Sequence, residues 1–160
     1  MQRALEVPIL VDVIEKWTIL HTAIAHNNVE LIEGLLKDGM DVNSQNLALW
    51  TPLHEAAYRD RPAIVRRLLE AGADPNKQTD TGWTPLHYAC SDACHGPEVA
   101  RLLLDYGADP TAVEKDGYIP FDLAVALPAW YSSRGALLDL FRERFPELVF
   151  ERYCAPAPGP

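Results

Sequence analysis

The sequence predicts an all-α solenoid, a stack of helix–turn–helix repeats that each span about 33 residues. Three similar heptapeptides occur along the chain, and their histidines, His21, His54 and His87, follow one another at equal intervals. A fixed period of this length is typical of repeat proteins, because one small helix pair cannot bury its apolar face alone. Stacked neighbours can bury these faces in one continuous core.

A second marker, a glycine followed by a short polar turn, comes after each heptapeptide. Gly39 and Gly72 follow the corresponding histidines at equal distances along the chain, whereas Gly107 follows its histidine two positions later than they do. Glycine tolerates the left-handed conformation that commonly ends a helix, so each marker predicts the end of a second helix in its repeat. The extra length of the third repeat therefore falls between its two helices, within Cys90–Pro97.

Each regular repeat carries local signals for an inner and an outer helix. Thr51 and Thr84 can accept hydrogen bonds from the first amides of the inner helices, and Pro52 and Pro85 then occupy the first helical position. Apolar residues recur in steps of three and four in the outer helices. They are Val29, Ile32, Leu35 and Leu36; Ile64, Val65, Leu68 and Leu69; and Val99, Leu102 and Leu103.

The Thr-Pro-Leu-His sequence at 51–54 and 84–87, together with the regular period of about 33 residues, resembles the ankyrin repeat. This resemblance covers about residues 17–145 and implies repeats made of a short β-hairpin finger, an inner helix and an outer helix. The expected division is an N-terminal cap at 1–16, ankyrin repeats at 17–49, 50–82 and 83–117, a divergent C-terminal capping repeat at 118–150 and a flexible tail at 151–160.

The finger that enters the second repeat departs from the pattern. The third repeat has Asp80-Thr81-Gly82 before its tryptophan, whereas the second has Leu47-Ala48-Leu49. The turn glycine is missing, and two leucines occupy positions that are polar or glycine in the third repeat. We therefore expect a different or looser tip that carries apolar side chains.

The resemblance also implies where a partner would bind. In ankyrin-like proteins, partners usually dock on the concave face that the finger tips and inner helices form, and aromatic side chains dominate binding hot spots. The predicted partner-binding residues are Leu47, Leu49, Trp50, Glu55, Tyr58, Trp83, Tyr88 and Tyr118. The alternative is that each aromatic ring packs against the adjacent finger and contributes only to folding.

Composition restricts the class of partner. The chain has 14 basic and 23 acidic side chains and a formal net charge of −9, so phosphate backbones would repel it and nucleic acid is excluded as a partner. No apolar stretch approaches the roughly 18 residues of a membrane span. Three cysteines cannot all pair with one another, which favours a reducing compartment. We expect a monomeric cytoplasmic protein that binds another protein.

The leading hypothesis is a non-catalytic protein–protein interaction module, an adaptor or an inhibitor, with no cofactor, metal or catalytic residue. A stoichiometric inhibitor of the immunity or antitoxin type is one alternative, because small acidic proteins can mask basic active sites. A metal-binding or enzymatic site at Cys90, Cys94 and His95 is the alternative from another class, although a zinc site needs about four ligands. The three repeat histidines lie too far apart to share one ion and are expected to form hydrogen bonds within and between turns.

Overall fold

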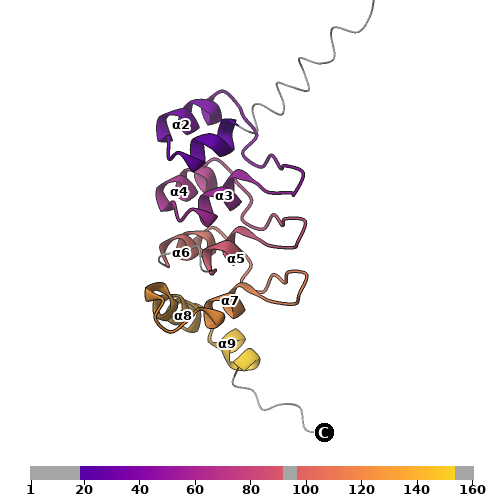
Figure 1. The fold of residues 1–160 in the computed structure, drawn as a ribbon, viewed down its shortest axis with the longest axis vertical. Helices are drawn as coiled ribbons and strands as arrows, with labels where there is room; N and C mark the ends of the chain where they lie inside the picture. Colours follow the sequence, from indigo (N-terminus) through magenta and orange to yellow (C-terminus); the bar gives the residue numbers. More distant parts are fainter. Residues whose placement is uncertain (1–18, 92–96, 154–160) are drawn as a thin grey trace, which may run out of the picture.

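The computed structural model describes residues 19–91 and 97–153, which form a single stack of helix pairs in chain order (Figure 1). A helix over residues 19–25 is followed by α2 (Val29–Lys37), α3 (Pro52–Tyr58), α4 (Pro62–Glu70), α5 (Pro85–Ala89), α6 (Glu98–Asp105), α7 (Pro120–Ala126), α8 (Ser132–Arg144) and α9 (Pro146–Tyr153). The predicted all-α repeat solenoid is confirmed. None of the helices in this described part of the chain is long and apolar enough to cross a lipid bilayer.

The inner helices form a layer beside the fingers and are the helix over residues 19–25, α3, α5 and α7. The outer helices α2, α4, α6 and α8 form the opposite layer (Figure 1). The three fingers close over residues 46–50, 79–83 and 114–118 and project to the same side of the stack. They have the outline of hairpins, but no β-strand occurs within the described ranges. In each finger one amide donates across the turn to a carbonyl, as between Thr79 and Trp83 at 2.9 Å.

Both predicted N-caps are found at the inner helices. The Thr51 hydroxyl accepts from the His54 amide at 3.3 Å, and His54 Nδ1 accepts from the Thr51 amide at 3.1 Å. Pro52 occupies the first helical position, where its missing N–H leaves no bond unmade. Thr84 is the N-cap of α5, and its amide donates to His87 Nδ1 at 3.1 Å. These local bonds explain why the short inner helices start where the sequence predicts.

Two of the three repeat histidines, His54 and His87, join one repeat to the next, as the sequence indicates. Because His54 Nδ1 accepts from an amide, the ring proton lies on Nε2, which donates to the Trp83 carbonyl at 3.1 Å. His87 makes the equivalent bond to the Tyr118 carbonyl at 3.2 Å. Burial lowers the pKa of His54 to about 4 and also lowers the pKa of His87. Both rings are therefore neutral parts of the scaffold.

The neutral state of His54 predicts that acid destabilises the stack. In the unfolded chain the His54 ring takes up a proton below pH about 6.5, whereas in the folded chain it does so only near pH 4. Above pH 6.5 the His54 ring is neutral in both states, so it does not destabilise the fold. The free energy of unfolding should then fall by about 3 kcal/mol as pH drops from 6.5 to 4. Urea unfolding of the wild type and of His54→Gln between pH 7.5 and 4.5 would measure this effect. Equal pH dependence in the two proteins would contradict it.

Two asparagines form a second series of bonds between repeats. Asn43 Nδ2 donates to the Gly72 carbonyl at 3.0 Å, and Asn43 Oδ1 accepts from the Asp74 amide at 2.7 Å. Asn76 makes the same pair of bonds to the following repeat, with Gly107 and with Asp109. Neighbouring repeats are thus fixed both at the inner helices and at the turns that follow the outer helices.

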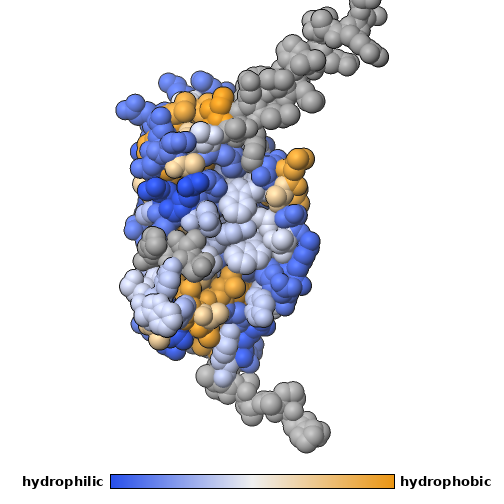
Figure 2. Space-filling model, in the orientation of Figure 1, coloured by the Kyte–Doolittle hydropathy of each residue, from blue (hydrophilic) through white to orange (hydrophobic). Residues whose placement is uncertain are grey.

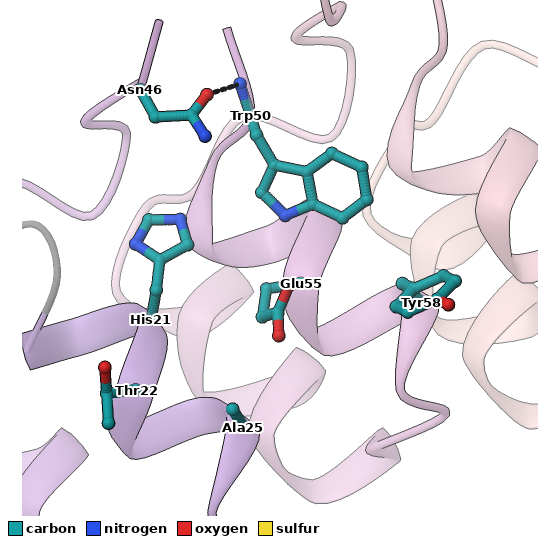
Figure 3. A pocket seen from close by; sticks show the side chains of 7 residues that line it. All are labelled: His21, Thr22, Ala25, Asn46, Trp50, Glu55 and Tyr58. Carbon is teal, nitrogen blue, oxygen red and sulfur yellow. Dashed lines mark hydrogen bonds between the residues drawn. The ribbon is translucent and has the colours of Figure 1, made fainter. Parts of the chain in front are cut away.

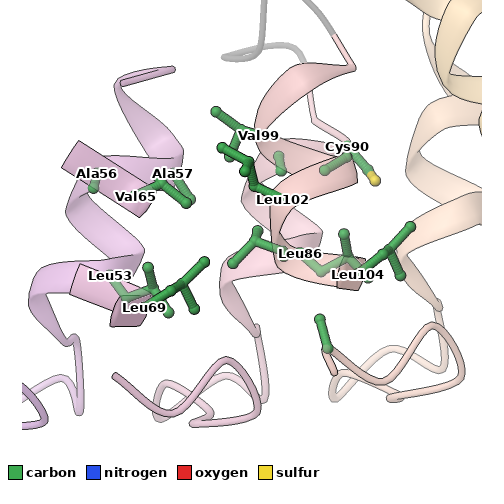
Figure 4. Close-up of a cluster of buried hydrophobic side chains, with 14 of the residues drawn as sticks. Leu53, Ala56, Ala57, Val65, Leu69, Leu86, Cys90, Val99, Leu102 and Leu104 are labelled. Atoms are coloured by element: carbon green, nitrogen blue, oxygen red, sulfur yellow. The ribbon is translucent and has the colours of Figure 1, made fainter. Parts of the chain in front are cut away.

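The hydrophobic core runs the length of the stack between the two helix layers. Figure 4 shows a part of it from the middle of the stack. Ala56, Ala57 and Ala89 are completely buried, and their small side chains allow close approach between inner helices. The outer helices contribute larger buried residues, among them Leu68 and Leu103. Every repeat shares its core with its neighbours, which is the arrangement that gives repeat proteins their nearest-neighbour stability.

The C-terminal end of the stack corrects one sequence prediction. The predicted flexible tail begins at residue 151, but residues 151–153 belong to α9. Asp122, which replaces the repeat histidine in α7, accepts hydrogen bonds from Arg152 at 2.5 and 3.1 Å and from the Tyr153 hydroxyl. These bonds hold the end of α9 against the fourth repeat.

The Asp122 carboxylate has a second role within its own helix. Its Oδ2 accepts from the Ile119 amide at 2.9 Å, so it caps α7 as His54 caps α3. Burial alone would raise the pKa of Asp122, but the bonds from Arg152, Tyr153 and Ile119 outweigh it and lower that pKa. The predicted N-terminal cap at 1–16 lies outside the described residues.

Candidate functional site

The middle of the finger side carries a cluster of aromatic rings from the second and third repeats, called here the aromatic cluster: Trp50, Tyr58, Trp83 and Tyr88. Tyr88 lies between the two tryptophans, with ring centroids 4.6 Å from Trp50 and 4.7 Å from Trp83. The Tyr58 ring stands edge-on to Trp50 at 6.0 Å and to Tyr88 at 6.1 Å. Tilted and edge-on pairs at these distances are favourable ring geometries.

The cluster combines ring packing with exposure. Trp50, Trp83 and Tyr88 are half-buried, whereas Tyr58 is 46% exposed. Burial raises the pKa of Tyr88 to about 12, so this phenol remains neutral at physiological pH. The sequence left open whether the rings pack on one another or face a partner. In this arrangement the contacts between rings fix the cluster, and its outer edges remain accessible.

The first described finger, residues 46–50, differs from the expectation of a looser tip. Its Leu49 amide donates to the Asn46 carbonyl at 2.9 Å, the same turn bond that Gly82 and Gly117 make in the other fingers. Leu49 adopts φ 57°, a left-handed conformation that favours glycine. The prediction of a different tip was wrong, because this finger keeps the turn of its siblings with a leucine in the glycine position.

Polar contacts explain how the finger holds this strained residue. Asn46 Oδ1 accepts from the Ala48 amide at 2.9 Å and from the Trp50 amide at 2.8 Å. The Ala48 carbonyl accepts from the Asp80 amide of the next finger at 3.0 Å. As a result, Leu47 is fully exposed and Leu49 is 45% exposed. Figure 2 shows this finger tip as a hydrophobic projection at the edge of the molecule.

Replacing Leu49 by glycine is expected to raise the free energy of unfolding by about 0.5–1 kcal/mol. The left-handed conformation costs a leucine about 1–2 kcal/mol, and the greater freedom of glycine in the unfolded chain offsets part of that gain. Urea unfolding would measure the change. Gly117→Ala is the matched control, because Gly117 has φ 88° in the same turn and open space for a Cβ, so it should lose stability. A loss of stability in Leu49→Gly would contradict the interpretation of strain.

An open groove of ≈ 460 Å³ lies beside the aromatic cluster, between the first two inner helices (Figure 3). Its lining residues come from the helix over residues 19–25, from the first finger and from α3. They are His21, Thr22, Ala25, Asn46, Trp50, Glu55 and Tyr58. Glu55 Oε1 accepts from Arg59 Nε at 2.5 Å, and the Glu55 side chain is 15% exposed. Trp50 belongs to both the groove and the aromatic cluster.

The structure brings most, but not all, of the predicted partner-binding residues together. Leu47, Leu49, Trp50, Glu55, Tyr58, Trp83 and Tyr88 lie on the first two described fingers and on helices α3 and α5. Tyr118 is exposed on the last finger, and no aromatic ring among the described residues contacts its ring. That these residues bind a partner remains a prediction.

The predicted set of partner-binding residues omits four residues that line the groove: His21, Thr22, Ala25 and Asn46. His21 was assigned a scaffold role by its repeat position. Asn46 could have been found from the sequence, because a polar acceptor precedes each finger aromatic by four residues. Thr79 and Glu114 occupy the equivalent positions and accept from the Trp83 and Tyr118 amides at 3.1 and 3.0 Å.

The structure describes only part of the alternative metal or enzymatic site. Cys90 is completely buried in the hydrophobic core at the end of α5. Cys94 and His95 lie outside the described residues. Among residues 19–91 and 97–153, no three histidine, cysteine or acidic side chains are grouped as metal ligands. The predicted absence of a catalytic or metal site remains a prediction.

Comparison with protein families agrees with the geometry of the stack. The model of the ankyrin repeat family, which contains three copies of the repeat, matches residues 4–79 and again residues 20–114. These matches cover more than half of the chain, which therefore belongs to the ankyrin repeat family. A search of curated proteins found no match to this chain. Ankyrin repeats are generally protein–protein interaction modules and typically are not catalytic.

Proposed function

We propose that this protein is a non-catalytic module that binds one partner protein through the finger side of the second and third repeats, as an adaptor or an inhibitor. The binding surface consists of the tip leucines of the first finger together with the aromatic cluster. Cytoplasmic location and the absence of a cofactor are part of this proposal.

The observation that carries the proposal is the tip of the first finger. Leu47 is fully exposed and Leu49 is held in a left-handed conformation that a glycine would adopt without strain. Backbone strain of this kind persists where the surrounding structure enforces it, and it is concentrated at functional sites. The two exposed leucines lie on the same finger as Trp50, and the tryptophan and tyrosine rings of the aromatic cluster are the residue types that dominate binding hot spots. Folding of the finger alone requires neither leucine, since the other fingers make the same turn with glycine.

The test begins with affinity capture of the partner from cells of the source organism, followed by titration of the purified partner. The double variant Leu47→Ser/Leu49→Ser should weaken binding by at least about 30-fold, which corresponds to about 2 kcal/mol. Its far-ultraviolet circular dichroism should match that of the wild type, because both side chains lie on an exposed turn.

The matched control is Trp130→Ser, which removes another exposed apolar side chain, in the segment between α7 and α8. This variant should bind the partner as tightly as the wild type. The opposite result, in which Trp130→Ser weakens binding and the finger variant does not, would move the binding site to that segment and overturn the proposal.

The inhibitor form of this function has a specific expectation. The net charge of −9 favours a basic partner, and an inhibitor of the immunity type would cover that partner's active site. If the captured partner is an enzyme, equimolar addition of this protein should abolish its activity. If the enzyme keeps full activity in the saturated complex, the protein is an adaptor and not an inhibitor.

A further inference from the structure

We propose that the groove between the first two inner helices accepts a cationic side chain of the partner, an arginine or a lysine. This inference rests on the proposed function, since the cationic side chain would belong to the bound protein. It names the chemistry that the groove recognises and therefore the kind of sequence that the partner must present.

The charge of the groove comes from Glu55. It is the only carboxylate among the lining residues, and no lysine or arginine lines the groove. Its Oε1 atom accepts from Arg59, while Oε2 has no hydrogen-bond partner within the described ranges. Figure 3 shows the Glu55 side chain below the Trp50 ring, with Tyr58 farther along α3. Because the Glu55 side chain is only 15% exposed, the surrounding protein partly excludes water and strengthens the attraction between its carboxylate and a cation.

The pair between Glu55 and Arg59 leaves this site open to a second cation. The two residues are four positions apart on or just after α3, and the Arg59 side chain is 41% exposed. A carboxylate can accept bonds on both oxygens, so an incoming cation can bind Oε2 while Arg59 remains on Oε1.

The aromatic walls favour the same occupant. Trp50 and Tyr58 both line the groove, with their ring centroids 6.0 Å apart and their planes at 75°. A cation placed against such rings is attracted by their negative faces, and tryptophan is the strongest partner for this interaction. Thr22, on the opposite wall, offers a hydroxyl oxygen as a further acceptor. An anionic side chain would meet the Glu55 carboxylate in the groove, whereas Arg59, the basic side chain that pairs with it, does not line the groove.

The position of the groove makes the site part of the proposed binding surface. Trp50 is the last residue of the first finger, so its ring joins the groove to the tip leucines. A peptide segment that covers the finger tip with apolar side chains can place a basic side chain in the groove. The expected partner sequence therefore has an arginine or lysine next to apolar residues.

The probe is a capped tripeptide, acetyl-Gly-Arg-Gly-amide, titrated into the isotopically labelled full-length protein. The indole N–H resonance of Trp50 should shift saturably with a dissociation constant in the millimolar range. The citrulline analogue has nearly the same shape but no charge, and it should bind at least about 10-fold more weakly. Equal shifts with the two peptides would overturn the proposal.

Variants of the protein supply the second arm. Glu55→Gln should weaken binding of the arginine peptide by at least about 10-fold, and Tyr58→Leu should weaken it while retaining an apolar wall. Glu98→Gln, which removes an exposed carboxylate from the outer helix α6, should bind as the wild type does. If Glu55→Gln and Tyr58→Leu both bind the peptide as tightly as the wild type, the groove is not a cation site.

The two proposals can fail separately. A captured partner that binds the wild type and Glu55→Gln equally, but loses affinity for the finger variant, would overturn the cation site and leave the proposed function intact. A groove that binds the arginine peptide in a protein whose finger variant keeps full partner affinity would support the cation site and contradict the proposed surface.

Discussion

Replacing Phe121 by alanine is expected to lower the free energy of unfolding by about 3–5 kcal/mol. Phe121 is 2% exposed and lies at the junction of the last three helices. Its ring centroid is 5.2 Å from that of Phe141 in α8 and 5.4 Å from that of Tyr153 in α9. Alanine would leave a cavity between α7, α8 and α9, in place of the ring that packs against Phe141 and Tyr153.

The loss of local stability caused by Phe121→Ala should be uneven along the chain. In a repeat stack, a defect at one end loosens the terminal repeat first, because each repeat is stabilised by its immediate neighbours. Hydrogen exchange should therefore show weaker protection in α7, α8 and α9 than in α3 and α4, and urea unfolding should give the total. Trp130→Ala, at a side chain that is 85% exposed, should change stability by less than about 0.5 kcal/mol. A loss below about 1 kcal/mol for Phe121→Ala would contradict this packing.

Leu68→Ala should cost about 2–5 kcal/mol, with a different spatial pattern. Leu68 is completely buried in α4, an outer helix in the interior of the stack. A cavity there weakens the contacts of the second repeat with both of its neighbours, so protection from exchange should fall in α2 and α6 as well as in α4.

The control for Leu68 is another leucine on an outer helix. Leu31 lies in α2 and is 41% exposed, so Leu31→Ala removes the same atoms with little cavity formation. We expect its loss of stability in urea unfolding to be at least about 2 kcal/mol smaller than that of Leu68→Ala. Similar losses for the two variants would contradict the assignment of the buried face of the outer helices.

The scaffold could be predicted from the sequence because its signals are local and repeated. Thr51 and Pro52 determine the start of an inner helix within one turn, and Gly72 has the left-handed conformation, φ 89°, expected at the end of an outer helix. The constant period of the repeats then places equivalent residues side by side. A bond such as that between His54 and the Trp83 carbonyl follows from the period together with the position of the histidine.

The tip of the first finger could not be predicted in the same way. Losing the glycine at position 49 indicates a different turn when the finger is considered alone. The turn is kept by the Asn46 side chain and by a bond from the Asp80 amide in the next finger to the Ala48 carbonyl. Contacts between fingers therefore override the local preference of Leu49, and no local pattern reports such contacts.

The candidate site was predictable only in outline. The repeat pattern indicates which positions point to the finger side, but not which rings meet. Tyr88 lies between Trp50 and Trp83 because adjacent repeats are offset along the stack, and a one-dimensional pattern does not contain that offset. The bonds from Arg152 and Tyr153 to Asp122 span 30 and 31 residues without any repeated motif, so the end of α9 was also missed.

The hydrogen bonds between repeats all run in one direction along the chain, and Asp122 ends this series. The side chains of His54, His87, Asn43 and Asn76 each donate to a carbonyl of the repeat that follows. The fourth repeat has Asp122 at the histidine position, and an ionised carboxylate only accepts hydrogen bonds, so it cannot continue the series. Arg152 and Tyr153 satisfy that acceptor from within the same chain. Helix α9 thus covers the side of the fourth repeat on which another repeat would stack. A further repeat could be joined by the same series of bonds only if Asp122 were replaced by a donor such as histidine.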